Sequence, residues 1–247
     1  MLAGLTVSAI LWIRRTNDDP MLALVWLGGL VGALLGAHVG FILAELPARI
    51  DGSGGWLEIL GGRTILGALL GGYLGVEGAK RMVGYRDTTG DVFAFIAPIG
   101  LVLGRIGCLL QGCCPGRPCA AAWYAILDAE GVTRWPAPVV ESLFNLLAAL
   151  LLAHLHRRRV LPGQLFHVYL MAYGVFRFGH EFARDTPRLG GGFSGYQVLA
   201  LLVAGFGTVR FLQRWGSSPT HGSPGMNIRF SPARRPNVDL RKDETAG

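Results

Sequence analysis

The sequence predicts an all-α protein, a polytopic membrane helix bundle of about seven transmembrane helices. Hydrophobic residues make up 51% of the 247 residues and charged residues only 16%, whereas soluble domains carry about 25% charged residues. The mean hydropathy is +0.41. The 37 glycines agree with this class, because small residues let helix backbones approach one another closely in lipid.

Apolar runs account for these helices in order along the chain. They cover residues 1–13, 21–46, 64–83, 92–110, 139–155, 165–182 and 196–212. The first run is shorter than the roughly 20 residues that a span requires. A signal-peptide core fits it poorly, because no Lys or Arg precedes it and no small-residue cleavage site follows. We therefore expect a first span whose start is missing. The segments between the runs hold Pro, Gly and charged residues, as loops do.

Composition also divides the chain and orients it. Residues 1–215 are expected to form one transmembrane domain, and residues 216–247, rich in Ser, Pro, Gly and Arg, a disordered basic tail. The loops near residues 80–86 and 157–159 hold more Lys and Arg than the alternate loops, so we place them and the tail in the cytoplasm. The loop between Arg117 and Arg134 then faces outward.

The net charge of +7 raises the question of nucleic-acid binding. The basic residues, however, form short clusters between apolar runs, which is the membrane pattern. No nucleotide-binding loop and no duplicated half is apparent. The sequence therefore gives no support to a helicase, channel or transporter.

The most informative segment lies at the end of the fourth run, residues 92–110, and just after it. Residues 104–117 read Gly-Arg-Ile-Gly-Cys-Leu-Leu-Gln-Gly-Cys-Cys-Pro-Gly-Arg. An arginine at the end of an apolar run is costly unless it has a partner or a function. The glycines around it leave room for a ligand to approach the backbone. We interpret Arg105 as part of an intramembrane anion site.

All the cysteines lie in or just after this segment. They are Cys108, Cys113, Cys114 and Cys119, with the spacing C-x4-C-C-x4-C. Structural zinc sites usually pair cysteines two to four residues apart, so this spacing is a poor match for zinc and we assign no metal ligand here. Outside the cytoplasm a disulfide is the first interpretation. Small buried hydrophobes, metal ligands and a reactive thiol remain as alternatives.

Four motifs follow one another at characteristic places along this pattern. They are Arg63-Thr64-Ile65-Leu66-Gly67-Ala68-Leu69-Leu70-Gly71-Gly72, the loop with Gly104-Arg105-Ile106-Gly107, Gly112 and Gly116-Arg117, the segment Trp135-Pro136-Ala137-Pro138-Val139-Val140-Glu141, and Phe176-Arg177-Phe178 with Glu181-Phe182, Arg184 and Gln197. In order and spacing, over residues 62–212, they resemble the prolipoprotein diacylglyceryl transferase family.

The resemblance implies an activity and its substrates. This family moves a diacylglyceryl group from phosphatidylglycerol to the lipobox cysteine thiol of a prelipoprotein, in the bacterial plasma membrane and without a cofactor or metal. Such a protein must hold a phosphate, stabilise the leaving group and accept a thiol proton. The planar guanidinium group suits the first two tasks, because it binds phosphate through paired hydrogen bonds and stays charged in a poor dielectric.

The resemblance also assigns residues. The catalytic candidates are Arg105, Arg177 and Glu181, with His180 as an alternative base, and the substrate-binding candidates are Arg105, Gly112, Gly116, Arg117, Glu141 and Gln197. Glu141 opens one run and Arg177 lies near the end of the next, so antiparallel neighbours would bring them to one height. We expect Arg105, Gly116, Glu141, Arg177 and Glu181 to surround one cavity near the outer leaflet, open sideways to lipid.

Plainer interpretations of the same residues stay open. Arg177 and Glu181 lie four residues apart and would form an ion pair on one helix face. Arg105 would fit a snorkelling interface arginine. The chain also departs from the family pattern, with Cys108 in place of Asn, Cys113 in place of Glu and Leu66 in place of His. The alternative function is therefore a non-catalytic, redox or metal-handling membrane relative that binds an anionic phospholipid headgroup.

Overall fold

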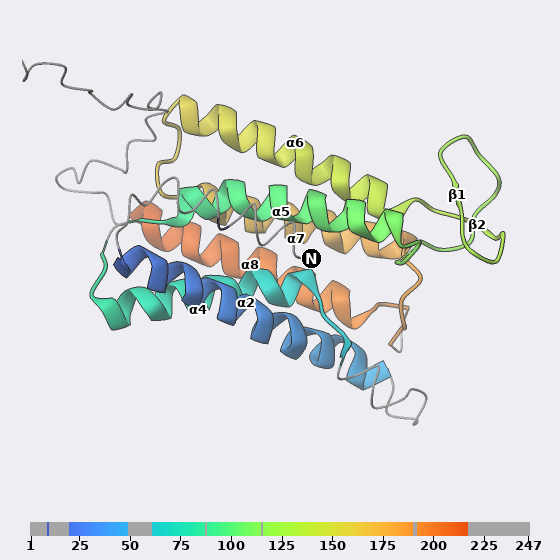
Figure 1. Cartoon of the computed structure of the whole chain (residues 1–247), viewed down its shortest axis with the longest axis horizontal. Coiled ribbons are helices and arrows are strands. Elements are labelled where there is room, and N and C mark those ends of the chain that lie inside the picture. Colours follow the sequence, from blue (N-terminus) through green and yellow to red (C-terminus); the bar gives the residue numbers. More distant parts are fainter. Residues whose placement is uncertain are drawn as a thin grey trace, which may run out of the picture.

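Long helices run roughly along one another and form the body of the computed structural model (Figure 1). The structure describes residues 9, 20–48, 61–86, 88–114, 116–189 and 192–216. Within these ranges the elements are α2 (Pro20–Glu45), η1 (Leu46–Ala48), α4 (Ile65–Val83), α5 (Gly90–Leu110), β1 (Ile126–Leu127), β2 (Thr133–Arg134), α6 (Ala137–Arg157), α7 (Leu165–His180), η2 (Glu181–Ala183) and α8 (Gly195–Gly216). The protein is therefore a helical membrane bundle.

The predicted spans after the first correspond to α2, α4, α5, α6, α7 and α8. Among the described residues, 4 of these helices, α2, α5, α6 and α8, are long and apolar enough to cross a membrane. The predicted first span at residues 1–13, apart from residue 9, and the predicted tail after residue 216 lie outside the described residues.

Glycines hold α2 against α4. Gly28, Gly32 and Gly36 recur every fourth residue on α2, and Gly67, Gly71 and Gly75 do so on α4. A Cβ atom added to most of these glycines would overlap the facing backbone; at Gly71 it would lie 2.7 Å from the Cα atom of Gly36. Positions four apart share one helix face, so the two backbones meet along a continuous strip.

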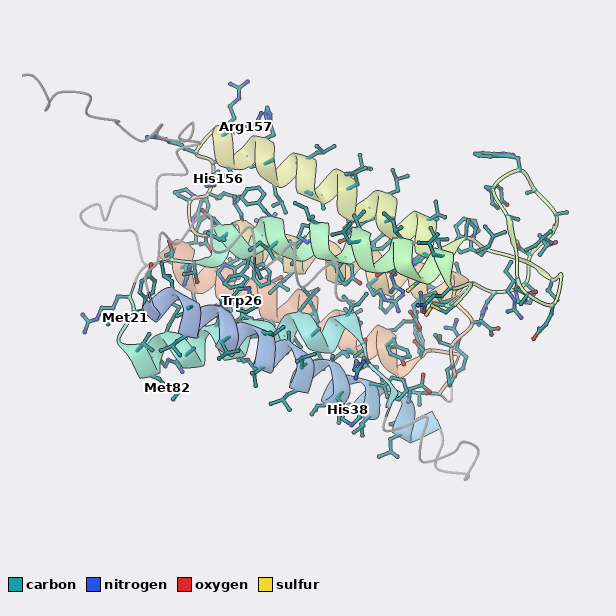
Figure 2. The ribbon with its side chains drawn as sticks, viewed as in Figure 1. Met21, Trp26, His38, Met82, His156 and Arg157 are labelled. Carbon is teal, nitrogen blue, oxygen red and sulfur yellow. The ribbon has the colours of Figure 1, made fainter. Side chains whose placement is uncertain are left out.

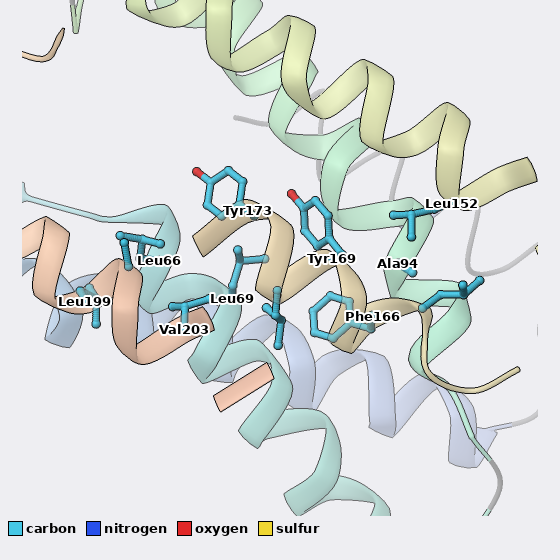
Figure 3. Close-up of a cluster of buried hydrophobic side chains, with 12 residues drawn as sticks. Leu66, Leu69, Ala94, Leu152, Phe166, Tyr169, Tyr173, Leu199 and Val203 are labelled. Carbon is cyan, nitrogen blue, oxygen red and sulfur yellow. The ribbon is translucent and has the colours of Figure 1, made fainter. Parts of the chain in front are cut away.

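The core surrounds α7. Tyr169, Tyr173 and Leu170 of this helix are buried, and Leu66 and Val203 pack into the same cluster from α4 and α8 (Figure 3). In contrast, α6 exposes Leu146, Leu147, Leu150 and Leu151. A large apolar face of this kind suits contact with lipid tails rather than water.

The two ends of the bundle differ. Met21, Met82, His156 and Arg157 lie at the end away from the β1–β2 hairpin (Figure 2). At the hairpin end, β1 pairs with β2 in antiparallel register. The side chain of Asp128 binds Arg134 and the backbone N–H groups of Val132 and Glu130, and these bonds hold the pKa of Asp128 below its usual range. The basic loops assigned to the cytoplasm thus share the end opposite the hairpin.

Candidate active site

A cluster of buried ion pairs lies at the hairpin end of the bundle. Arg105 Nη2 is 2.8 Å from Glu141 Oε2, and Arg177 Nη1 is 2.8 Å from Glu181 Oε2. Arg184 joins the two pairs, because its guanidinium lies 3.9 Å from Glu141 Oε2 and 3.8 Å from Glu181 Oε2. Both carboxylates are fully buried. The structure therefore brings together Arg105, Glu141, Arg177 and Glu181, as the sequence predicts.

Helix geometry explains how these side chains meet. Arg105 lies near the end of α5, and Glu141 is in the first turns of α6. On α7, Tyr173 and Arg177 are four residues apart, and Glu181 follows Arg177 by four. Side chains at this spacing lie above one another on a single face. This face of α7 lies against α6, so its row of polar side chains, which includes Tyr173, contacts Glu141.

Hydrogen bonds extend this row into the core. The hydroxyl group of Tyr173 donates to Glu141 Oε1 at 2.7 Å. One turn further, the hydroxyl group of Tyr169 donates to Asn145 Oδ1 at 2.7 Å. Because a buried carboxylate without donors is costly, Tyr173 stabilises the charged form of Glu141 together with Arg105.

The cluster holds more positive than negative charge. Arg105, Arg177 and Arg184 face the two carboxylates of Glu141 and Glu181. Among the described residues, buried guanidinium nitrogens without a hydrogen-bond acceptor include Nε of Arg105 and both Nε and Nη1 of Arg184. Burial and the charges of Arg177 and Arg105 lower the pKa of Arg184. The arrangement can therefore accept an anion.

Loop backbones close over the cluster. Gly116 N donates to Trp135 O at 2.9 Å, and Arg117 N donates to Ala183 O at 3.0 Å. A Cβ atom on Gly116 would lie 2.7 Å from that Trp135 oxygen, so glycine permits this approach. Arg117 also donates through Nε to the carbonyl oxygen of Arg184 at 3.2 Å. Gly116 and Arg117 thus position the Arg184 segment.

Gln197 reaches the cluster through neighbours. Its Oε1 accepts from Ser194 N at 2.8 Å and lies 3.5 Å from Arg188 Nη1. The hydroxyl group of Ser194 lies 3.4 Å from Glu181 Oε1, and Thr186 donates to that same oxygen at 2.7 Å. Gln197 therefore orders the loop that presents Arg188 and Thr186.

His180 is engaged by its surroundings. Its ring stacks on Phe176 with centroids 5.1 Å apart, and Trp135 Nε1 donates to its Nε2 at 3.4 Å. A ring nitrogen that accepts this bond has its lone pair occupied. Glu181 is engaged as well, through Arg177 and Thr186, so the choice of Glu181 or His180 as the proton acceptor stays a prediction.

Gly112 and the cysteines lie beside the cluster. Gly112 has φ of 63° and follows the end of α5, where it serves as the left-handed cap of that helix. All the cysteines are free thiols. The structure therefore does not contain the disulfide that we expected for cysteines outside the cytoplasm. Instead, the sulfur atoms of Cys108, Cys113 and Cys114 lie within 4.8 Å of one another. A spacing that matches zinc sites poorly therefore still brings three thiols together.

A shallow apolar hollow opens near the start of α8, the helix that carries Gln197. It lies between α2 and α8, and its lining includes Leu43, Pro47, Leu189, Val198 and Leu202. Leu43, Val198 and Leu202 are half or more exposed, so the hollow faces the side of the bundle. The predicted single cavity that encloses the ion cluster stays a prediction.

Sequence reasoning did not assign roles to Tyr173, Arg184, Arg188 and Ser194. A signal for Tyr173 existed, since it continues the spacing of four that links Arg177 and Glu181. Arg184 and Arg188 continue this spacing by steps of three and four residues, although both lie beyond α7 and η2, whereas Ser194 carries no such signal. Their positions depend on how the loop between α7 and α8 folds back over the ion pairs.

Comparison with known proteins adds an independent finding. The family model described as prolipoprotein diacylglyceryl transferase matches residues 1–213. A protein from Cupriavidus necator is 33% identical over 70% of this chain and 64% of its own length. One from Bordetella bronchiseptica is 31% identical over 74% of this chain and 75% of its own, and one from Clostridium tetani is 26% identical over 75% and 78%. All three are named phosphatidylglycerol–prolipoprotein diacylglyceryl transferase.

Proposed function

The chain belongs to the prolipoprotein diacylglyceryl transferase family, and from this we propose that it transfers a diacylglyceryl group from phosphatidylglycerol to the lipobox cysteine thiol of a prelipoprotein. The observation that carries the proposal is the surplus of buried guanidinium groups over carboxylates around Glu141 and Glu181. Guanidinium groups bind phosphate through paired hydrogen bonds.

The reaction requires one bond to form and one to break. The cysteine sulfur attacks a glyceryl carbon, the bond from that carbon to the phosphate oxygen breaks, and glycerol phosphate leaves with the electron pair. Arg105 and Arg177 bind the phosphate and stabilise the charge that develops on the leaving oxygen. The thiol proton passes to Glu181, whose carboxylate is buried beside Arg177 and Arg184.

Binding and access fall to the remaining residues. Arg184 supplies donors to the phosphate through Nε and Nη1, which lie 3.8 and 3.9 Å from the carboxylates but have no hydrogen-bond acceptor. Glu141 holds Arg105 in place at 2.8 Å. Gly116, Arg117 and Gln197 order the loops over the headgroup. The apolar hollow between α2 and α8 suits an acyl chain, because it opens sideways and its lining is mostly apolar.

We place the protein in the bacterial plasma membrane with the hairpin end outward. Residues 1–215 then form the transmembrane transferase domain, and the tail after them is cytoplasmic. The support is the excess of Lys and Arg in loops at the opposite end, including residues 80–81 and 157–159. The ion cluster would accordingly lie near the outer leaflet, where the prelipoprotein cysteine arrives.

A reporter fusion tests this orientation. Alkaline phosphatase inserted at Glu130, in the loop between β1 and β2, is expected to be active, because that enzyme needs the oxidising exterior of the plasma membrane. A fluorescent protein that folds only in the cytoplasm should not fluoresce when it is inserted at the same site. The reverse pair of results would place the ion cluster at the inner leaflet and contradict the orientation.

Replacing Tyr173 with phenylalanine should lower the rate of lipidation more than tenfold. The ring still fills the core, but Glu141 loses the 2.7 Å bond from the hydroxyl group. A hydrogen bond to a charged group contributes roughly 1.5–3 kcal/mol, and about 1.4 kcal/mol corresponds to tenfold in rate. Tyr169→Phe is the matched control, since its hydroxyl binds Asn145 outside the ion pairs. Equal loss of activity in both variants would make Tyr173 a purely structural residue.

The transferase activity itself is tested by complementation. A conditional strain depleted of its own transferase should grow when it expresses this chain, and its prelipoproteins should acquire the diacylglyceryl group. Arg177→Ala at equal membrane abundance should fail. If the unaltered chain reaches the membrane in full amount yet leaves prelipoproteins unmodified, while it still binds phosphatidylglycerol vesicles, the non-catalytic alternative replaces this proposal.

A further inference from the structure

Three thiols of the sequence motif form a group that the transfer reaction does not use. The sulfur atoms of Cys108, Cys113 and Cys114 lie within 4.8 Å of one another. Cys114 is exposed, so the group is open to solvent from one side. Cys119, the remaining cysteine, is not part of it.

The end of α5 creates this proximity. Gly112 N donates to Leu109 O at 3.2 Å and Cys113 N donates to Cys108 O at 3.0 Å, around a glycine with φ of 63°. These bonds form the Schellman motif, in which the side chains at the positions of Cys108 and Cys113 normally make an apolar contact. Here the two side chains in contact are thiols. The distance between Cys108 and Cys113 therefore follows from the way the helix is capped.

Cys114 completes the triangle by an unusual backbone conformation. Its φ is 61°, in the left-handed region that non-glycine residues seldom occupy. Such a conformation costs on the order of 1 kcal/mol or more and persists where the surroundings require it. The turn folds the chain back at once after Cys113, and the third sulfur reaches the other two.

The spacing fits a metal ion bound by three sulfurs. A thiolate sulfur lies about 2.3 Å from a bound metal, so three sulfurs in a trigonal plane are roughly 4.0 Å apart. Among the described residues no fourth His, Cys, Asp or Glu belongs to the group. Zn²⁺ in structural sites requires four ligands, whereas soft thiolate sites also select Cu(I).

We propose that Cys108, Cys113 and Cys114 bind one Cu(I) ion as three thiolates. Binding releases the thiol protons to solvent and leaves a net charge of −2 on the metal and its ligands. Arg105 lies on the same face of α5, with Nη1 3.9 Å from Cys108 Sγ, and offsets part of this charge. The site is distinct from the proposed phosphate site, although both contact Arg105.

A competition titration tests the proposal. The full-length chain, purified in detergent and kept reduced without oxygen, is titrated with Cu(I) against the chromogenic chelator bicinchoninate. We expect one equivalent of Cu(I) to be withheld from the chelator. Cys114→Ser should weaken retention at least tenfold, and so should Cys108→Ser. The matched control Cys119→Ser should retain the metal as the unaltered chain does.

A second measurement needs no variant. Bound Cu(I) should protect the three thiols from iodoacetamide while Cys119 still reacts, as read by mass spectrometry of the peptides. Failure to retain Cu(I), equal loss in Cys119→Ser, or protection of all four cysteines would overturn the site. Tighter retention of Zn²⁺ than of Cu(I) would overturn the choice of metal. Recovery of a Cys108–Cys113 disulfide that cannot be reduced to a copper-binding form would assign the group to redox chemistry instead.

Discussion

Replacing Arg105 with lysine is expected to lower lipidation more than tenfold although the positive charge remains. In the structure Arg105 Nη2 pairs with Glu141 Oε2 at 2.8 Å, while its buried Nε has no acceptor. A guanidinium group can therefore hold the carboxylate and present another donor to a phosphate. The ammonium group of lysine is a compact point charge without this planar fork.

The magnitude follows from the lost contact. If lysine keeps the ion pair with Glu141, the variant folds, and what disappears is one charge-assisted hydrogen bond to the phosphate. Such a bond contributes about 1.5–3 kcal/mol, and roughly 1.4 kcal/mol is tenfold in rate. Arg105→Ala is a harsher change, because it leaves Glu141 buried without its partner and should destabilise the fold by about 3–5 kcal/mol.

The measurement is incorporation of labelled diacylglyceryl groups into a model prelipoprotein by membranes of equal enzyme content. Arg158→Lys is the control, since this exposed residue directly follows α6 as its C-cap, at the opposite end of the bundle. Both variants should unfold at the temperature of the unaltered chain, and only Arg105→Lys should lose activity. Near-normal lipidation by Arg105→Lys would rule out a two-pronged role for this arginine.

The sequence predicts the helices well because local apolar runs mark them, although among the described residues only α2, α5, α6 and α8 are long and apolar enough to cross a membrane. Six predicted spans correspond to α2, α4, α5, α6, α7 and α8. The pairing of Arg177 with Glu181 was also predictable, since the spacing of four places them on one face of α7 and the turn that follows it. These features need no knowledge of tertiary packing.

Other features depend on contacts between segments far apart in the chain, which local sequence patterns do not predict. No sequence pattern around Arg105 indicates that Glu141 is its partner. The two side chains form an ion pair because α5 packs against α6. Arg184 enters the cluster through a loop. The cysteine triangle arises from left-handed turns at Gly112 and Cys114, which a spacing rule for zinc ligands does not describe.

Gly71→Ala is expected to destabilise the bundle strongly, by an amount on the order of 1–3 kcal/mol or more. A Cβ atom there would overlap the carbonyl oxygen of Gly32 and lie 2.7 Å from the Cα atom of Gly36. Neither atom belongs to a flexible side chain, so α2 and α4 must separate. Separation also opens the other glycine contacts along the strip, because the helices are rigid.

Gly78→Ala is the matched control on the same helix. A Cβ atom at Gly78 meets nothing within 4 Å, and alanine is the better helix former by about 1 kcal/mol. We therefore expect this variant to unfold in detergent at the same temperature or slightly higher, and Gly71→Ala several degrees lower with reduced membrane abundance. If the two variants unfold together, close backbone contact does not hold α2 to α4, and apolar side chains along the interface must supply the stability instead. The contrast separates packing from helix propensity, since both variants add the same methyl group to α4.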